Sequence, residues 1–587
     1  MCGIAGVMMR QGAAVAPSTL DALVSALRHR GPDGSGRHLA GDVGLVQTRL
    51  AIIDLQTGDQ PLYEPGGAAL VANGEIYNYV ELRQQMADTP FQTQSDCEVP
   101  LWLYRRDGVE FANDLRGMYA IAIHDPAEAK LVLARDPFGI KPLYYVERDD
   151  LFAFASEPQA LIAAGLVEPG VEDRQREELL QLQFTTGGQT IFRGIKRVLP
   201  GETVVVRGGR IVERRRRQAL PTGGPEQIGM EDAVKRLDTA LTDSVMVHQR
   251  SDVPYGLFLS GGIDSSAILA LMAKLNDQPV VAFTAGFSGG KVHDERDHAR
   301  MLAKKVNAEH HEVDFGEEDF WSLLPRVAAA VDDPAADYAI LPTWKLAQTA
   351  AQGLKVILSG EGGDEIFAGY GRYRSVLRPW FLGGRTIRHR GNFHGLDVLR
   401  ENSSDWRDGI ATTEAVSHAQ GRSKLQAAQA VDAADWLSND LLTKLDRCLM
   451  AHGLEGRTPF LDPVVADAAF RLPDGLKIRK GLGKYVLRQW LNGVMPEAEP
   501  FSRKRGFTVP VGGWIAAKGE RLGELVEGQE AIGRICKPGR VKDLFAAGDK
   551  HKGFAAWVLL FYALWSKHHI EGVDIRQASV FEALAAR

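Results

Sequence analysis

The sequence predicts two domains, an α+β domain of stacked sheets followed by an α/β domain with a parallel sheet. The chain of 587 residues exceeds the size at which a single core usually stops growing, so two or more domains are expected. Short β-like runs fill the first 200 residues. Strands then alternate with helical stretches, which is typical of a parallel sheet covered on both faces.

The β-like runs of the first part are separated by turn residues, and helical stretches such as 18–30 lie between them. This pattern predicts an αββα arrangement of stacked sheets flanked by helices over residues 1–210. The chain then becomes rich in Gly and Pro around ALPTGGPEQIG, so we expect a linker over 211–228.

The second domain is expected over residues 229–587. A long helix is predicted over 230–250, and six alternating strands and helices follow, from YGLFLSGG to LKVILSG. Residues 374–440 carry the weakest pattern and are interpreted as an insertion. The apolar stretch 554–565 is too short to cross a bilayer and predicts a core helix.

Composition excludes several classes of function. The net charge of −6 gives no general attraction to nucleic acid or anionic membranes, so neither is expected as a partner. The only basic run, 213–218, is interpreted as part of the solvated linker. Four cysteines without a CxxC pair or zinc-like spacing indicate neither a disulfide framework nor a structural metal, which fits the reducing cytoplasm.

A glycine-rich turn follows a predicted strand in GLFLSGGIDSS, residues 256–266. Glycines let the backbone approach a ligand closely, and free N–H groups at a helix start favour a phosphate. No GKS or GKT follows, so a Walker-type NTPase is not expected. The SGGxDSS string instead resembles the loop of the pyrophosphate-loop (PP-loop) ATP pyrophosphatases, which split ATP between its α and β phosphates.

A second acidic, glycine-rich turn, SGEGGDE, follows the predicted strand before residue 359. Two such turns at the carboxyl ends of parallel strands are expected to face one crevice. Asp264 and Asp364 could then hold Mg²⁺ against a pyrophosphate, because hard oxygen ligands suit that ion. Glu361, in the same turn, is then the candidate catalytic residue. Further cations are offered by Lys484 and Arg488, predicted on a helix, and by Lys504 and Arg505.

Cys2 is the candidate nucleophile of the first domain. Removal of Met1 would give this one residue both a thiol and a free α-amine. An α-amine has an unperturbed pKa near 8, so it can accept the thiol proton near neutral pH. Other motifs follow in order: HRGPDG, QTRLAIIDL, NGEIYN, SDCE, RGMYAIAIHD and ARDPFGIKPLYY.

This combination resembles the class II, N-terminal-nucleophile (Ntn) glutamine amidotransferases. The rest of the chain resembles the synthetase domain of the glutamine-hydrolysing asparagine synthetase B family, through DDPAADYAILPTWKLA, LLTKLDRCLMAHGLEGRTPFLDP and GLGKYVLRQW. For glutamine, the resemblance implies Cys2 as nucleophile, Arg49 on the α-carboxylate, Glu75 and Asp96 at the α-amine, and an oxyanion hole at Asn73 and Gly74. The implied glutamine-binding residues are Arg49, Leu50, Ala51, Ile52, Ile53, Asn73, Gly74, Glu75 and Asp96.

In the second domain the resemblance implies that Glu361 and Lys484 act in catalysis, with Lys484 on the phosphates. The implied ATP-binding residues are Leu259, Ser260, Gly261, Gly262, Asp264, Ser265, Ser266, Ala285, Ser359, Gly360 and Asp364, with Asp264 and Asp364 as the metal ligands. Four positions depart from the family pattern: Ala285, Asp333, Gly453 and Gly456.

The resemblance implies a cytoplasmic homodimer that converts L-aspartate, L-glutamine and ATP, with Mg²⁺, into asparagine, glutamate, AMP and pyrophosphate through a β-aspartyl-adenylate and channelled ammonia. One alternative is an amidotransferase of the same architecture that amidates a peptide or sugar acid, with 374–440 as the source of that preference. From another class, an inactive glutamine and ATP sensor would be expected to have lost Cys2, Asp264 or Glu361, yet all three are present. A β-lactam-forming cyclase and a tRNA-thiolating pyrophosphatase both fit the sequence less well than these alternatives.

Overall fold

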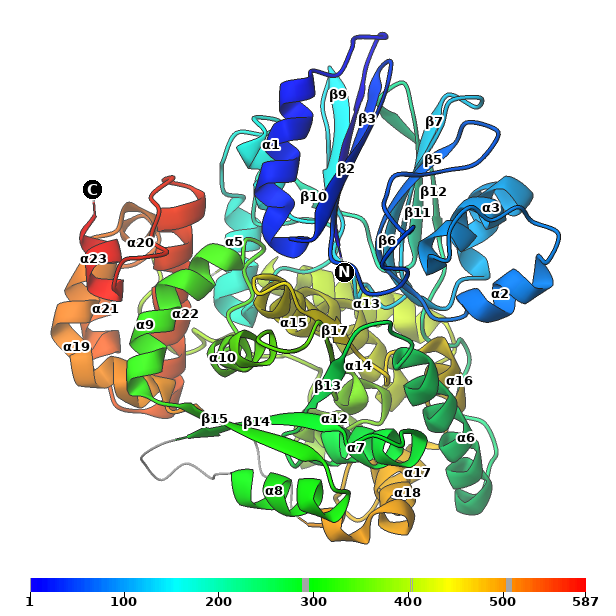
Figure 1. Ribbon diagram of the computed structural model, residues 1–587. Helices are drawn as coiled ribbons and strands as arrows, with labels where there is room; N and C mark the ends of the chain where they lie inside the picture. The colour runs from blue at the N-terminus through cyan, green and yellow to red at the C-terminus, as the bar shows by residue number, and fades with distance from the viewer. Residues whose placement is uncertain (1, 288–294, 402, 404, 503–508, 587) are drawn as a thin grey trace.

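The first domain consists of two stacked six-stranded sheets between layers of helices. We describe a computed structural model of the chain, covering residues 2–287, 295–401, 403, 405–502 and 509–586. One sheet has the order β10-β8-β9-β1-β3-β2 and the other β12-β11-β7-β6-β5-β4. The predicted αββα arrangement is thereby confirmed, as the upper part of Figure 1 shows.

The strand bounds of this domain follow the predicted β-like runs. The first sheet is built from β1 (Cys2–Met9), β2 (Gly34–Ala40), β3 (Val43–Arg49), β8 (Tyr144–Glu147), β9 (Leu151–Ala155) and β10 (Lys196–Arg197). The second is built from β4 (Leu62–Tyr63), β5 (Ala69–Ile76), β6 (Gly117–Asp125), β7 (Lys130–Arg135), β11 (Glu202–Arg207) and β12 (Arg210–Arg216).

Burial explains the near-continuous apolar runs of the central strands. Side chains of both sheets, including Ile4, Leu45 and Val71, form a core between them. The outer face of the first sheet packs against α1 (Pro17–Leu27). The outer face of the second packs against α2 (Tyr79–Gln85) and α3 (Val99–Asp107). A strand covered on both faces needs apolar residues on both, whereas the edge strand β2 alternates in burial.

The basic run 213–218 does not lie in a linker as expected. Most of it belongs to β12, an edge strand that pairs with β11 and crosses the expected boundary at residue 210. Charged side chains are common on edge strands, where they face water and discourage pairing with other chains. The division of the chain at residues 210 and 228 stays a prediction.

The second domain is built on a five-stranded parallel sheet, as predicted. Its order is β15-β14-β13-β16-β17, and every neighbouring pair is parallel. The strands are β13 (Tyr255–Phe258), β14 (Val281–Phe287), β15 (Glu309–Phe315), β16 (Val356–Leu358) and β17 (Glu455–Arg457). Alternate residues serve opposite faces: Leu358 packs with α7 (Ile263–Leu275) and α8 (Arg296–Lys305), and Ile357 with α10 (Ile340–Ala350) and α15 (Leu442–Met450).

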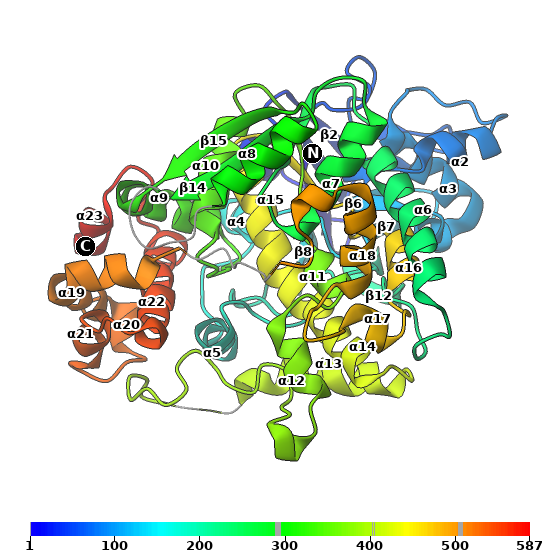
Figure 2. The same ribbon diagram turned by 90° about the horizontal axis from the view of Figure 1, so that it is seen from below.

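Further helices surround this sheet. The predicted long helix is α6 (Met230–His248), and the apolar stretch 554–565 lies in α22 (Lys550–His569), which is buried as expected. The region 374–440 holds α13 (Asp408–Ala419), α14 (Lys424–Val431) and the π-helical η6 (Asp432–Leu441). In Figure 2, α13 and α14 lie near α12 (Gly371–Leu377), in the lower part of the view. Within the described ranges, no helix has both the length and the apolar character needed to span a bilayer.

The two domains share hydrophobic cores and buried ion pairs. Leu50 and Phe138 of the first domain belong to the same cluster as Leu257 of the second. The guanidinium of Arg30 is fully buried and donates two hydrogen bonds to Asp446 of α15, at 2.7 and 3.0 Å. Nε of the same Arg30 donates to the carbonyl oxygen of Cys2 at 3.3 Å, which places Cys2 at this seam, where Figure 1 marks the N-terminus.

Candidate active sites

Cys2 lies at the start of β1, where it pairs with Arg49 of β3. Its side chain is buried, and the Gln47 side-chain amide lies 2.9 Å from Sγ and donates to it. Burial raises the pKa of the Cys2 thiol, because the thiolate loses its hydration. A thiol held neutral in this way needs a base beside it before it can attack, which is the role expected for its own α-amine.

Asn73 and Gly74 of β5 lie beside the nucleophile. The Asn73 Oδ1 accepts a hydrogen bond from the backbone N of Cys2 at 3.1 Å. Its Nδ2 is buried and, within the described part of the chain, donates to no protein group. A Cβ at Gly74 would lie 2.1 Å from the carbonyl oxygen of Met118, so only glycine fits there. An unused buried amide donor next to a thiol suits the oxyanion of a tetrahedral intermediate.

Of the other expected glutamine-binding residues, Arg49 and Leu50 lie beside Cys2. Arg49 ends β3, and its guanidinium donates to Asp59 at 2.7 Å and to the carbonyl of Asp54. Leu50 and Ile52 are buried, while Ala51 and Ile53 are partly exposed.

Two carboxylates lie buried at this site. Asp96 accepts a hydrogen bond from the backbone N of Ile76 at 2.7 Å, and burial raises its pKa. Burial and the neighbouring Asp96 also raise the pKa of Glu75 well above its ordinary value. Arg457 lies 3.4 Å from Glu75 and opposes part of this shift, and the α-ammonium of an amino acid would be a second favourable cation beside these two acidic groups.

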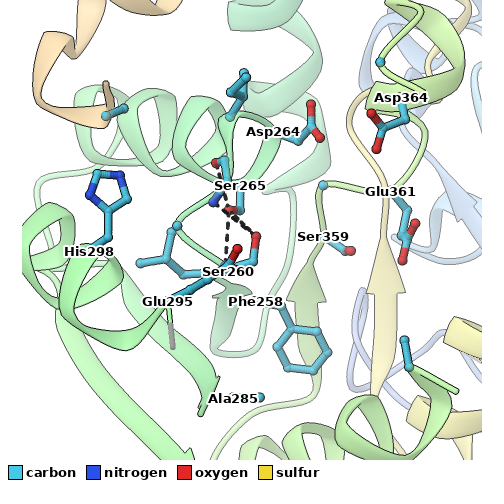
Figure 3. A pocket seen from close by; sticks show the side chains of 18 of the residues that line it. Phe258, Ser260, Asp264, Ser265, Ala285, Glu295, His298, Ser359, Glu361 and Asp364 are labelled. Atoms are coloured by element: carbon cyan, nitrogen blue, oxygen red, sulfur yellow. Dashed lines mark hydrogen bonds between the residues drawn. The ribbon is translucent and has the colours of Figure 1, made fainter. Parts of the chain in front are cut away.

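The phosphate loop of the second domain connects β13 to α7. Its hydroxyls form a closed set of hydrogen bonds, with 3.1 Å between the oxygens of Ser260 and Ser265 (Figure 3). Ser265 also donates to the carbonyl of Gly262 at 3.2 Å. These bonds hold the turn in shape ahead of the N-terminus of α7, where backbone N–H groups favour an anion.

The second glycine-rich turn leads from β16 into α11 (Gly363–Ile366) and lies beside the phosphate loop. A Cβ at Gly363 would lie 2.4 Å from Oδ1 of Asp264, so the two turns approach too closely for a larger residue. β13 and β16 are neighbours in the sheet, which brings both turns to one crevice as predicted. Figure 3 shows Asp264, Glu361 and Asp364 around this crevice.

The crevice is a cavity of about 520 Å³. The predicted residues that line it are Leu259, Ser260, Gly261, Gly262, Asp264, Ser265, Ala285, Ser359, Gly360, Glu361, Asp364 and Lys484. Ser266 does not line it, because its side chain points into the core from α7 and is fully buried. The cavity also has an apolar wall that includes Phe258 and Phe283, suited to an adenine ring.

Lys484 joins the two turns but is not on a helix as expected. It precedes α18 (Tyr485–Val494) with a φ of 56°, a left-handed conformation. From there its ammonium contacts Asp264 and lies 2.8 Å from Asp364. Burial alone would lower the pKa of Lys484, but the two carboxylates raise it. Arg488 does lie on α18, whereas Lys504 and Arg505 lie outside the described residues.

Asp264 and Asp364 fit the expected Mg²⁺ through the chemistry of their donors. They converge on one cation, Lys484, and hard carboxylate oxygens are the ligands that Mg²⁺ prefers. Among the residues that the structure describes, no group of three or more His, Cys, Asp and Glu side chains is arranged to hold a metal. A magnesium ion here would therefore take its remaining ligands from phosphates and water.

Two residues with contacts at these sites had no role in the sequence-based interpretation. Lys444 of α15 lines the cavity and lies 3.7 Å from Glu361. Arg457 of β17 reaches Glu75 of the first domain at 3.4 Å. Both lie in the stretch LLTKLDRCLMAHGLEGRTPFLDP, so the motif drew attention to the segment but not to these side chains. Asp333, a departure from the family pattern, pairs with Arg197 at 2.7 Å and does not line the cavity.

The fold and these two sites define an Ntn-type glutamine amidotransferase domain joined to a PP-loop synthetase domain. Residues 1–216 match the family model described as glutamine amidotransferase domain, and residues 236–567 match asparagine synthase. The chain therefore belongs to the asparagine synthase family.

Relatives align with nearly the whole chain. A putative glutamine-hydrolysing asparagine synthetase of Mycobacterium tuberculosis is 33% identical over 99% of each chain. Asparagine synthetase 1 of Bacillus subtilis is 33% identical over 97% of each, and asparagine synthetase B of Escherichia coli is 30% identical over 90% of this chain and 86% of its own.

Proposed function

We propose that this protein is a glutamine-hydrolysing, ATP-dependent asparagine synthetase. One observation carries the proposal: two sites lie on either side of the interface that the domains share. One is the buried thiol of Cys2 beside the unused amide donor of Asn73, and the other is the phosphate loop with its neighbouring acids. The names of the relatives agree with this activity. The proposal assigns the residues above the roles expected from the sequence, and divides the chain near residues 210 and 228.

In the first domain, the Cys2 thiolate attacks the side-chain carbonyl of glutamine, and the α-amine of Cys2 takes the thiol proton. Asn73 Nδ2 and the Gly74 backbone stabilise the oxyanion. Ammonia leaves, and water then cleaves the thioester to give glutamate. Arg49 binds the α-carboxylate through its planar fork, and Glu75 with Asp96 binds the α-ammonium.

In the second domain, a carboxylate oxygen of aspartate attacks the α-phosphorus of ATP, and pyrophosphate leaves. Ammonia then attacks the acyl carbon, AMP leaves, and Glu361 accepts the surplus proton. Lys484 neutralises charge on the phosphates. A Mg²⁺ ion held by Asp264 and Asp364 would add to that neutralisation.

The proposal extends to assembly and location. We expect a homodimer that works in the cytoplasm without nucleic acid or a membrane as partner. The four cysteines are free and buried in the structure, as expected of a protein made in a reducing compartment. Size-exclusion chromatography with light scattering tests the dimer.

The activity is tested by incubating the full chain with glutamine, ATP, Mg²⁺ and aspartate. Asparagine, glutamate, AMP and pyrophosphate should form in equal amounts. Asp264→Ala should keep glutaminase activity and lose AMP formation. If aspartate gives no AMP while a peptide or sugar acid gives AMP and its amide, the broader amidotransferase alternative replaces this proposal. If no acid does so and the fully processed protein still binds glutamine and ATP, the sensor alternative replaces both.

A further inference from the structure

Lys444 is a buried cation on the wall of the ATP cavity. It extends from α15 with only 5% of its side chain exposed, and it lines the cavity together with Glu361. Its Nζ donates a hydrogen bond to Asp337 at 2.8 Å and lies 3.7 Å from Oε1 of Glu361. Within the described ranges, Nζ makes no second hydrogen bond, although an ammonium carries three hydrogens. Capacity for a further anionic partner therefore remains.

The positive charges of the cavity divide into two groups. Lys484 contacts Asp264 and Asp364, so it belongs to the phosphate side. Arg488 donates to backbone carbonyls, including Gly483 at 2.7 Å, which holds its guanidinium in place. Lys444 comes from a different helix and lies on the side of Glu361. Lys444 is therefore paired with different acids from those that hold Lys484.

The charge of Lys444 is secured by its surroundings. Burial alone would lower the pKa of its ammonium, but Asp337 and Glu361 raise it. An acceptor acid must enter a cavity lined by Asp264, Glu361 and Asp364, and ATP adds further negative charge. Bringing another anion there is costly without a nearby cation. The cavity wall near Asp337 and Lys444 includes Ala339, just before α10, and Thr343 and Leu346 of α10, small or apolar side chains that suit a compact acceptor.

We infer that Lys444 binds the non-reacting carboxylate of the acceptor, so that this cavity selects a short dicarboxylic acid. The inference deepens the proposed function and rests on it. The carboxylate that attacks ATP is consumed in the acyl bond, whereas the second one keeps its charge through both steps and stays paired with Lys444. A peptide or sugar acid with a single carboxylate would leave Lys444 with only the protein carboxylates of Asp337 and Glu361 as partners.

The test compares acceptors that differ in the second carboxylate. Ammonia serves as nitrogen source, so the first domain is bypassed, and AMP release is measured with aspartate, succinate and β-alanine. Aspartate and succinate carry two carboxylates, while β-alanine lacks the non-reacting one. Lys444→Met should lower kcat/KM for aspartate and succinate about 100-fold more than for β-alanine, because a charge-assisted hydrogen bond is lost. Lys444→Arg should keep part of the wild-type preference for aspartate and succinate over β-alanine, because the positive charge remains.

Matched variants separate binding from folding and positioning. Lys345→Met also breaks a Lys–Asp pair, with Asp319 at 2.6 Å, but Lys345 does not line the cavity, so the ratio between acceptors should not change. Glutaminase activity of each preparation reports on intact folding. If Lys444→Met fails this check, Lys444→Arg decides the question. Its longer, forked cation should change the ratio of kcat/KM for aspartate to kcat/KM for β-alanine by about tenfold from the wild-type ratio.

Equal loss for all acceptors would mean that Lys444 only positions Glu361, and would overturn the inference. A wild-type preference for a single-carboxylate acid would overturn it too. If wild-type enzyme amidates a different dicarboxylic acid and not aspartate, the asparagine reading fails while the assignment of Lys444 stands. If no acid yields AMP, both fail.

Discussion

The guanidinium of Arg457 lies 3.4 Å from the carboxylate of Glu75, across the boundary between the two domains. Glu75 is one of the residues proposed to bind glutamine, while the carbonyl oxygen of Arg457 accepts a hydrogen bond from the backbone N of Ser359 at 2.8 Å, one strand away in the parallel sheet. The same arginine also contacts Glu455 at 2.6 Å. The buried Arg457 thus contacts both Glu75 of the first domain and Ser359, which lines the cavity of the second.

Arg457→Met should destabilise the protein by about 3 to 5 kcal/mol, because it leaves the buried carboxylate of Glu455 without its cation. Thermal unfolding measures the effect. Adding Glu455→Gln should recover part of the loss, because it removes the stranded charge. Arg534→Met, which breaks the exposed pair with Glu530, should cost less than about 1 kcal/mol. Equal melting of Arg457→Met and wild type would show that the buried pair contributes nothing.

Cys2→Ala should abolish glutamine-dependent synthesis and keep ammonia-dependent synthesis, because ammonia from solution can replace ammonia released at Cys2. Both rates are followed by AMP release. Cys97→Ala is the matched control, since this second buried thiol lies 3.8 Å from the carbonyl of Gly74 yet has no nucleophilic role. Intact mass of active enzyme should show loss of Met1. Loss of the ammonia-driven reaction in Cys2→Ala would contradict a two-site enzyme.

Glu361→Gln should lower amide formation by about 10² to 10⁴, the usual contribution of general acid-base catalysis, and leave glutaminase intact. Burial raises the pKa of Glu361, and Lys444 opposes that shift. The control is Glu365→Gln: burial raises the pKa of Glu365 to about 8, so this carboxyl is already mostly neutral at pH 7. An unchanged rate in Glu361→Gln would remove this residue from the chemistry.

Lys477 should make stability depend on pH. Its side chain is buried, and burial lowers the pKa of its ammonium from 10.5 to about 7. Between pH 7 and 10.5 the unfolded chain therefore holds a proton that the folded protein lacks. Folding stability should rise with pH in this window by up to about 1.4 kcal/mol per pH unit. Lys477→Gln should flatten the rise in thermal midpoint, and identical profiles for both proteins would refute the assignment.

The sequence by itself predicted the fold class and the two local sites, because the information for both lies in contiguous residues. The strand-turn-helix string around Ser260 specifies a phosphate loop wherever it folds. Likewise, β-like runs in one half and strand-helix alternation in the other specify the layers. Even so, the sequence could not place Lys484, whose left-handed backbone departs from the helical pattern around it.

Only the tertiary structure decided how the sites are joined and what surrounds them. Arg30 and Asp446 are separated by 416 residues, yet they form a buried pair. Lys444 and Asp337 are 107 residues apart, and no local pattern relates them. Helical periodicity shows that Lys444 lies on α15 but not what faces it, since a lone lysine is ordinarily solvated. Its burial and charge partners are set by the packing of α15 against the sheet, which depends on contacts along the whole chain.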